Sequence, residues 1–328
     1  MSEISGRDPA AFGFEDIRYE KKDWIATVTI NRPDAYNSYT TRTLRELTEA
    51  FTDAGRDDAI AVLVVTGAGL DAFCTGGDVK EYARDYTRKP RDYWKYMGHF
   101  AGAIEALKNL GKPSIARING MAVGGGNEIN LACDLAIAAD TARFRQVGVQ
   151  VGSVAAGGAT QWLPLVIGDR RARQMLMTCE WVDAKTALAW GLVNEVVPVP
   201  ELDAAVARLA AKLLDTFPEC MRYTKQQTNF WKDLSWSMTI GHARDWLALH
   251  FASLEPYEGM TAFAEKRRAD RLGIRARARD GGSSETLWGP NARACPSCGA
   301  KGLPDSFTFC GVCGSSLVAS PGAVLAAR

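Results

Sequence analysis

This sequence has almost no net charge, few histidines and no long apolar run. Its 39 basic and 38 acidic residues leave a net charge of +1, which does not favour a nucleic-acid partner. Gly, Asn, Asp or Arg interrupts each apolar run before it could span a bilayer, so we expect no membrane partner. Residues 1–14 lack the basic region and apolar run of a signal peptide. Together these absences predict a cytoplasmic protein, with structural roles for the three histidines, His99, His242 and His250.

The eight cysteines fall into two groups. Four are scattered through mostly apolar segments and are expected to be buried, reduced thiols: Cys74, Cys133, Cys179 and Cys220. The other four form two CxxC pairs with eleven residues between them: Cys295, Cys298, Cys310 and Cys313. A glycine after each pair lets the chain bend, and four thiolates at this spacing predict a tetrahedral structural zinc in a small ribbon. Disulfides or an iron–sulfur centre are the alternatives.

This ribbon is too small to bury enough apolar surface to fold alone, so the metal would supply its folding free energy. Because the ribbon has few basic residues, we expect a protein partner for it rather than DNA. Residues 270–294 before it are rich in Arg, Gly and Ser, which is typical of a flexible linker.

The rest of the chain alternates short apolar strands with turns and helices. A helix capped by Thr40 is expected to run to about residue 55, and strands are expected at 24–30, 61–66, 115–118 and 135–138. This order predicts an α/β fold with a largely parallel sheet. From about residue 183 the pattern becomes helical, with an amphipathic helix at 202–214. We therefore divide the chain into a core at 1–200, a helical region at 201–270, a linker at 271–294 and a zinc ribbon at 295–320.

Two glycine-rich turns, each between a strand and a helix, carry the most informative chemistry. They are FCTGGDVK (73–80) and NGMAVGGGNE (119–128). Glycine lets a ligand approach the main-chain N–H groups closely, and the positive end of the next helix dipole adds to these donors. Two such turns that converge would form an oxyanion hole for a thioester carbonyl that becomes an enolate. Each turn alone is equally consistent with phosphate binding or with tight packing.

Four blocks, in order, resemble the signature segments of the crotonase (enoyl-CoA hydratase/isomerase) superfamily: FCTGGDVKEY, NGMAVGGGNEINLACD, GSVAAGGATQWLP and WGLVNEVVP. The resemblance covers about residues 14–270. It implies a spiral of ββα units with a helical C-terminal region used in trimerisation, giving a trimer or hexamer. It also implies an acyl-CoA substrate, no other cofactor for catalysis, and a thioester oxygen held by the N–H groups of Gly77 and Gly125.

Glu128 matches the first of two glutamates with which enoyl-CoA hydratases activate water. The position of the second holds Gly148, so half of the acid–base pair for concerted hydration is missing. The segment also resembles naphthoyl-CoA synthases and alicyclic ketoacyl-CoA hydrolases, whose catalytic aspartate is replaced here by Ala155. We expect Glu128 to act as general base or acid, with a pKa raised by an apolar pocket; a glutamate stabilised by a helix dipole is the alternative. Ser153 could position water or satisfy a turn.

The chain is most similar to the ring-opening 6-oxocyclohex-1-ene-1-carbonyl-CoA hydrolases of anaerobic aromatic degradation. Five segments carry this likeness: NRPDAYNSYTT (31–41), FCTGGDVKEYARDY (73–86), YMGHF (96–100), NGMAVGGGNEI (119–129) and GSVAAGGATQWLP (152–164). The likeness implies addition of water to a cyclic oxo-enoyl-CoA, followed by hydrolytic cleavage of the ring C–C bond. An enoyl-CoA hydratase or isomerase is the alternative enzyme. A non-catalytic scaffold that recruits partners through its ribbon is the alternative of another class.

Five further residues are candidates for contacts to the substrate. Tyr82 and Tyr86 could hydrogen-bond a ring ketone, although their i, i+4 spacing also suits packing. Asp78 follows the first glycine turn, where it could either cap the next helix or contact CoA. Lys266 and Arg267 could meet the CoA phosphates or form a solvated basic helix end.

Overall fold

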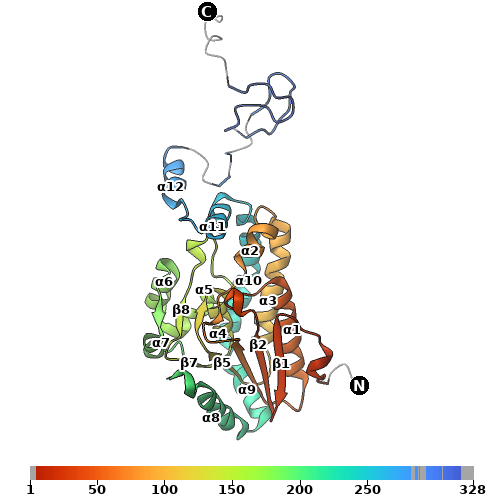
Figure 1. Cartoon of the computed structure of the whole chain (residues 1–328), viewed down its shortest axis with the longest axis vertical. Coiled ribbons are helices and arrows are strands. Elements are labelled where there is room, and N and C mark those ends of the chain that lie inside the picture. The colour runs from red at the N-terminus through yellow and green to blue at the C-terminus, as the bar shows by residue number, and fades with distance from the viewer. Residues whose placement is uncertain (1–4, 282–284, 287, 289–292, 305, 319–328) are drawn as a thin grey trace, which may run out of the picture.

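The computed structural model describes residues 5–281, 285–286, 288, 293–304 and 306–318. Two sheets and the helices around them form the body of the molecule (Figure 1). The small four-cysteine module lies beyond the end of the body that carries α11 (Leu254–Ala264) and α12 (Arg271–Arg279). The fold is mixed α/β, as the alternation of strand and helix patterns predicted.

The first sheet has six strands in the order β1-β2-β3-β5-β7-β10. Strands β1 and β2 are antiparallel, whereas the pairs from β2 to β10 are parallel. A strand with both faces buried is apolar throughout, which is why the apolar runs in the sequence located β3, β5 and β7. The strands are β1 (Ile17–Lys22), β2 (Ile25–Ile30), β3 (Val62–Gly67), β5 (Ser114–Ile118), β7 (Leu135–Ala139) and β10 (Glu195–Val197).

The second sheet has four short strands in the order β4-β6-β8-β9. They are β4 (Ala72–Cys74), β6 (Met121–Val123), β8 (Arg143–Arg145) and β9 (Val182–Asp183). Strands β4, β6 and β8 pair in parallel, and each follows a parallel strand of the first sheet: β3, β5 and β7 respectively. The chain therefore advances as a spiral in which each turn adds one strand to each sheet, as the family resemblance implied.

Helix α1 (Thr41–Arg56) packs against the first sheet and against α3 (Pro90–Lys108). Thr40 caps it: its side-chain oxygen accepts from the N–H of Thr43, whose own side chain accepts from the Thr40 N–H. Leu44 and Phe51, on the face predicted from the sequence, are buried in the core. Burial of each such side chain stabilises the fold by roughly 1.5–3 kcal/mol.

The amphipathic helix expected at 202–214 is α8, with the same bounds, whereas residues 271–279, predicted as linker, form α12. Asp270 caps α12 through the Gly273 N–H, and the Arg271 guanidinium donates to the Gln150 carbonyl. The linker was predicted from Arg, Gly and Ser, but residues 271–279 are mostly Arg and Ala or other good helix formers. The remaining helices of the body are α2 (Val79–Glu81), α4 (Gly125–Ala132), α5 (Ala159–Ile167), α6 (Asp169–Thr178), α7 (Ala184–Trp190), α8 (Leu202–Leu214), α9 (Pro218–Thr228) and α10 (Phe230–His250), with a π-helical turn, η3, at Tyr82–Tyr86.

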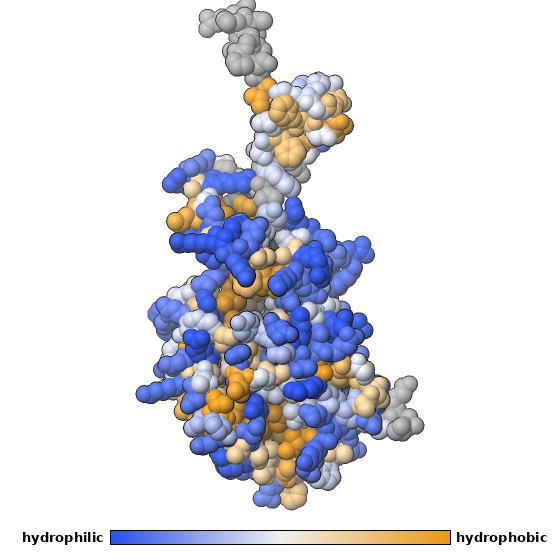
Figure 2. Space-filling view, viewed as in Figure 1, coloured by the Kyte–Doolittle hydropathy of each residue, from blue (hydrophilic) through white to orange (hydrophobic). Residues whose placement is uncertain are grey.

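Large apolar side chains are exposed at many places, and two groups of them bear on assembly. Helix α10 exposes large ones on its outer side: Phe230, Trp231, Met238 and Leu249. The C-terminal module exposes Phe309, Val312 and Val318, and Figure 2 shows apolar side chains gathered on it. Among the described residues, the helices lack the combination of length and apolar character that spanning a bilayer requires.

Candidate active site

The two glycine turns lie against each other at one edge of the second sheet. Strands β4 and β6, which lead into them, are parallel neighbours, so their carboxyl ends meet. A Cβ atom added to Gly76 would lie 3.0 Å from the Gly125 nitrogen, and one added to Gly126 would lie 1.9 Å from the Cys74 carbonyl oxygen. Glycine is therefore required at these positions because the two backbones touch.

The hydrogen bonds that hold these turns in place do not use the main-chain N–H groups of Gly77 and Gly125. Tyr39 pairs with Gly77 as a parallel bridge, through its N–H to the Gly76 carbonyl and its carbonyl to the Asp78 N–H, each at 2.9 Å. These bonds use the neighbours of Gly77, so the amide of Gly77 is not part of the bridge. Gly125 begins α4, and the first amides of a helix have no partner within it.

Glu128 lies in the first turn of α4 and is only 4% exposed. Its Oε1 accepts hydrogen bonds from the N–H groups of Gly157 at 2.8 Å and Ala159 at 3.1 Å. Burial raises the pKa of Glu128 from 4.5 to about 7, against the lowering effect of these two bonds. A carboxyl group with this pKa can both accept and return a proton near neutral pH, which suits a general base.

A cluster of tyrosines packs around the turns, and it brings one of the two predicted tyrosines to the site. A Cβ on Gly77 would lie 1.6 Å from the Tyr82 hydroxyl oxygen, which is also hydrogen-bonded to the hydroxyl of Tyr96. The Tyr86 hydroxyl is instead engaged with Thr41. Tyr82 thus contacts the glycine turn directly, whereas the hydroxyl of Tyr86 is directed to α1.

The same cluster contains residues that the sequence did not single out. A Cβ on Gly125 would lie 1.8 Å from the hydroxyl oxygen of Tyr39. Tyr93 stacks on Phe251, with ring centroids 3.5 Å apart. Tyr39 lies in the NRPDAYNSYTT segment but was given no role, since it precedes Gly125 by more than eighty positions and only folding brings them together.

A second carboxylate, that of Glu81, lies at the rim of the tyrosine cluster and is half-buried. It accepts hydrogen bonds from the Thr41 N–H, at 3.1 and 3.2 Å, and from the Tyr86 hydroxyl at 3.3 Å. Burial raises the pKa of Glu81, although these bonds act in the opposite direction. Before the structure was known, only its place after the glycine turn could have indicated Glu81.

Gly148, at one of the two positions expected to carry an auxiliary carboxylate, packs closely against the loop of Ser153 and Ala155. A Cβ on Gly148 would lie 3.0 Å from both the Ala155 nitrogen and the Ser153 carbonyl oxygen. The Ser153 N–H bonds to the Gly148 carbonyl at 2.8 Å, which closes this loop on itself. A longer side chain at residue 148 would therefore push two backbone segments apart.

Two of the three residues proposed for CoA contact, Asp78 and Arg267, are engaged with protein groups. Asp78 caps α2 through the Lys80 N–H at 3.0 Å and forms an ion pair with Arg32 at 3.1 Å. The Arg267 guanidinium binds both carboxylate oxygens of Glu258, at 2.6 and 2.9 Å, and also pairs with Glu265. The preceding Lys266 is exposed and has a left-handed backbone, with φ of 56°. The structural reading of Asp78 as a cap agrees with these bonds.

The four clustered cysteines place their sulfur atoms within 4.8 Å of one another. The Sγ atoms of Cys295 and Cys313 are 3.6 Å apart, and those of Cys298 and Cys310 are 3.8 Å apart. Zn–S bonds of about 2.3 Å in a tetrahedron require sulfur separations of roughly 3.8 Å, so the donor set fits zinc. The two halves of the module have the same local structure. Gly299 and Gly314 each have φ of 73°, and their N–H groups donate to the carbonyls of Cys295 and Cys310, respectively.

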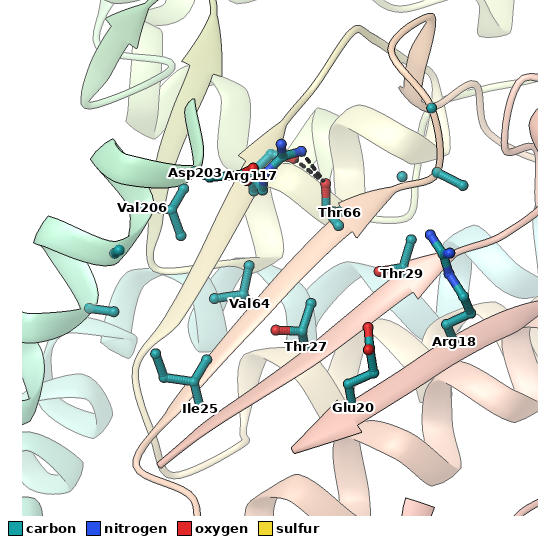
Figure 3. Close-up of a pocket in the computed structure, with 15 residues that line it drawn as sticks. Arg18, Glu20, Ile25, Thr27, Thr29, Val64, Thr66, Arg117, Asp203 and Val206 are labelled. Atoms are coloured by element: carbon teal, nitrogen blue, oxygen red, sulfur yellow. Dashed lines mark hydrogen bonds and ion pairs between the residues drawn. The ribbon is translucent and has the colours of Figure 1, made fainter. Parts of the chain in front are cut away.

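A groove of about 530 Å³ lies elsewhere, on the outer face of the first sheet beside α8 (Figure 3). Strands β2 and β3 direct Thr27, Thr29 and Thr66 into it, and the Arg117–Asp203 ion pair, at 2.7 Å, closes one side. Side chains alternate along a strand, so the intervening residues of β2 point into the core instead. None of the residues predicted for the active site lines this groove.

Comparisons with known proteins place this geometry among relatives. The family described as enoyl-CoA hydratase/isomerase matches residues 20–271, and the match ends before the four-cysteine module. The 6-oxocyclohex-1-ene-1-carbonyl-CoA hydrolase of Geobacter metallireducens is 33% identical, over 76% of this chain and 81% of its own length. An enoyl-CoA hydratase of Mycobacterium avium subsp. paratuberculosis has a TM-score of 0.71 at 28% identity, covering 78% of this chain and 98% of that one. DspI of Pseudomonas aeruginosa has a TM-score of 0.64 at 35% identity, covering 79% and 99%.

Proposed function

The chain belongs to the enoyl-CoA hydratase/isomerase family and acts on CoA thioesters, and we propose that it hydrates a cyclic oxo-enoyl-CoA and then opens the ring by hydrolysis. The observation that carries this proposal is the contact between the two glycine turns, with the buried Glu128 on the helix that follows the second turn. The relative from Geobacter metallireducens is a 6-oxocyclohex-1-ene-1-carbonyl-CoA hydrolase, and this name supports the choice of reaction.

In the first step Glu128 removes a proton from water, which adds to the carbon–carbon double bond conjugated with the thioester. The electron pair moves onto the thioester as an enolate, and the amides of Gly77 and Gly125 stabilise its oxygen. The protonated Glu128 then returns the proton to the α-carbon, which completes hydration. A carboxyl with a pKa of about 7 suits both halves of this exchange.

In the second step another water attacks the ring ketone. Glu128 takes a proton from this water as it attacks. The resulting alkoxide collapses to a carboxylic acid as the bond to the α-carbon breaks, and the electron pair again becomes a thioester enolate. The protonated Glu128 then returns the proton to the α-carbon. The amides of Gly77 and Gly125 therefore stabilise a thioester enolate in both steps, because hydration and ring cleavage both form one. Two waters are consumed, and the product is an open-chain hydroxy acyl-CoA with a new carboxyl group.

The test is to incubate the full chain with cyclic oxo-enoyl-CoA and linear enoyl-CoA thioesters and to follow the products by mass spectrometry. A gain of two waters on the cyclic substrate supports ring hydrolysis, and a gain of one water supports the alternative, an enoyl-CoA hydratase. Glu128→Gln should abolish turnover in either case. Glu46→Gln is the matched control, because Glu46 is also a buried carboxylate that accepts backbone N–H bonds, but on α1. Products formed at the wild-type rate by Glu128→Gln would remove the proposed base.

Two further parts of the proposal concern assembly and metal. The apolar side chains that α10 exposes, including Trp231 and Met238, support a homo-oligomer, a trimer or hexamer, in which they are covered. The sulfur separations support a structural zinc held by Cys295, Cys298, Cys310 and Cys313. The exposed Phe309 and Val312 on this module support a protein partner for it. Zinc would there supply folding free energy and take no part in the reaction.

A further inference from the structure

Ring hydrolysis makes a demand that hydration of a linear enoyl-CoA does not make. Attack of water on the ketone creates an alkoxide in addition to the thioester enolate, so the site must stabilise two separate oxygens. The amides of Gly77 and Gly125 serve the thioester oxygen. The ketone carbon is bonded to the same α-carbon as the thioester, so its oxygen lies close to the first. A second donor is therefore needed next to the glycine turns.

Tyr39 presents a hydroxyl group at this place. Its oxygen lies 1.8 Å from the point that a Cβ of Gly125 would occupy, which puts it in contact with the main chain of the second turn. The residue is 3% exposed. Its backbone is bonded on both sides to the first turn, through Gly76 and Asp78. Tyr39 thus contacts both turns: its main chain bonds to the first turn, and its phenol touches the second.

The ring of Tyr39 is held in one orientation. It stacks on Phe100 with centroids 5.3 Å apart and planes at 15°. Phe100 in turn packs against Gly157, where an added Cβ would lie 1.8 Å from its Cε1. Because the Gly157 N–H donates to Glu128, the same group of residues fixes both the phenol and the carboxylate.

The phenol is also available as a donor. Two of the neighbouring hydroxyls have a partner: Tyr82 with Tyr96, and Tyr86 with Thr41. Within the described part of the chain, the Tyr39 hydroxyl makes no side-chain hydrogen bond. Burial first, and then Tyr82 and Glu128, raise the pKa of Tyr39 well above its usual value, so the hydroxyl keeps its proton at neutral pH.

We propose that the Tyr39 hydroxyl donates a hydrogen bond to the ring ketone oxygen and forms a second oxyanion site that selects cyclic oxo thioesters. This inference rests on the proposed ring hydrolysis. Water activated by Glu128 attacks the ketone, and Tyr39 stabilises the alkoxide without losing its proton. The alkoxide then expels the α-carbon as the enolate. Tyr39 therefore binds the ketone of the substrate and acts as a catalytic residue in the second step.

Tyr39→Phe tests this directly, because it removes one oxygen and keeps the ring that stacks on Phe100. With the cyclic oxo-enoyl-CoA, we expect the two-water product to form about 10²- to 10³-fold more slowly, while the one-water intermediate accumulates. Hydration of a linear enoyl-CoA, which has no ketone oxygen, should slow by less than about tenfold, because Tyr39→Phe changes only the packing beside Gly125. Tyr19→Phe is the matched control, since Tyr19 is another buried phenol, bonded to Asp53 beside β1, and should leave both rates unchanged.

A binding measurement separates failure of this inference from failure of the proposed function. In the inactive Glu128→Gln background, we would compare the Kd of a cyclic oxo thioester with that of the same ring without its ketone. Adding Tyr39→Phe should reduce the preference for the ketone about tenfold, the value of one hydrogen bond. An unchanged preference, or loss of ring cleavage in Tyr82→Phe but not in Tyr39→Phe, would overturn the assignment. A wild type that hydrates but never opens the ring, with the preference lost in Tyr39→Phe, refutes ring hydrolysis and retains the ketone contact.

Discussion

Replacing Glu128 with glutamine should inactivate the protein and at the same time stabilise it above neutral pH. The pKa of Glu128 is about 7 in the folded state and 4.5 in its ordinary environment. An acid whose pKa is raised by folding stabilises the native state fully below about pH 4.5 and loses that contribution as the pH rises through 7. The difference corresponds to about 3 kcal/mol at pH 8, because one pKa unit is worth about 1.4 kcal/mol.

The assay is denaturant unfolding of wild type and Glu128→Gln at pH 4.5 to 8.5, at one protein concentration because the chain is proposed to be oligomeric. The stability of the variant relative to wild type should rise by about 3 kcal/mol between pH 4.5 and 8 and then level off. Any cost of the new amide group is independent of pH, so the slope isolates the carboxyl. Glu219→Gln is the control, because Glu219 is exposed and Arg222 lowers its pKa, so its removal should give no gain above pH 7.

A flat difference between the two proteins would refute this reasoning, since the carboxyl would then titrate alike in the folded and unfolded states. The same pKa predicts that kcat/KM of the wild type rises with pH through about 7, as the base loses its proton. Agreement between the kinetic and the stability transitions would assign both to Glu128.

Three other predictions follow from specific contacts. Gly125→Ala would place a methyl group 1.8 Å from the Tyr39 hydroxyl, so kcat/KM should fall by about 10²-fold, as measured by steady-state kinetics. The full chain should contain one zinc by elemental analysis; Cys298→Ser should lose it, whereas Cys220→Ser, at an exposed cysteine outside the cluster, should retain it. Trp231→Asp should shift the protein from oligomer towards monomer in light scattering, and an unchanged mass would place the subunit interface elsewhere.

The local shape of residues 148–155 bears on the type of acid–base catalysis. Concerted hydration with two carboxylates requires a second carboxylate near the double bond, and Gly148 packs too closely against Ser153 and Ala155 to be replaced by one. A single carboxyl that accepts and returns the same proton removes the need for a second group. The pKa of Glu128, near the pH of catalysis, is what such a mechanism requires.

Several features of the protein were determined by the sequence alone. Local hydrogen bonding and side-chain periodicity set the cap at Thr40 and the bounds of α8, and buried strands were visible as apolar runs. The glycine turns and the spacing of the four cysteines also followed, because backbone chemistry and metal-ligand geometry act over a few residues. The linker expected at 271–279 was wrong, since a composition typical of linkers also forms a helix once Asp270 caps it.

Only the tertiary structure decided what surrounds the carboxyl group of Glu128. The raised pKa of Glu128 comes from burial, and its partners at Gly157 and Ala159 lie on another element of the chain. The meeting of Tyr39 with Gly125 likewise requires parallel strands to align two distant turns. These properties depend on distances between segments far apart in sequence, and no local pattern encodes such distances, because they arise when the sheets pack and exclude water.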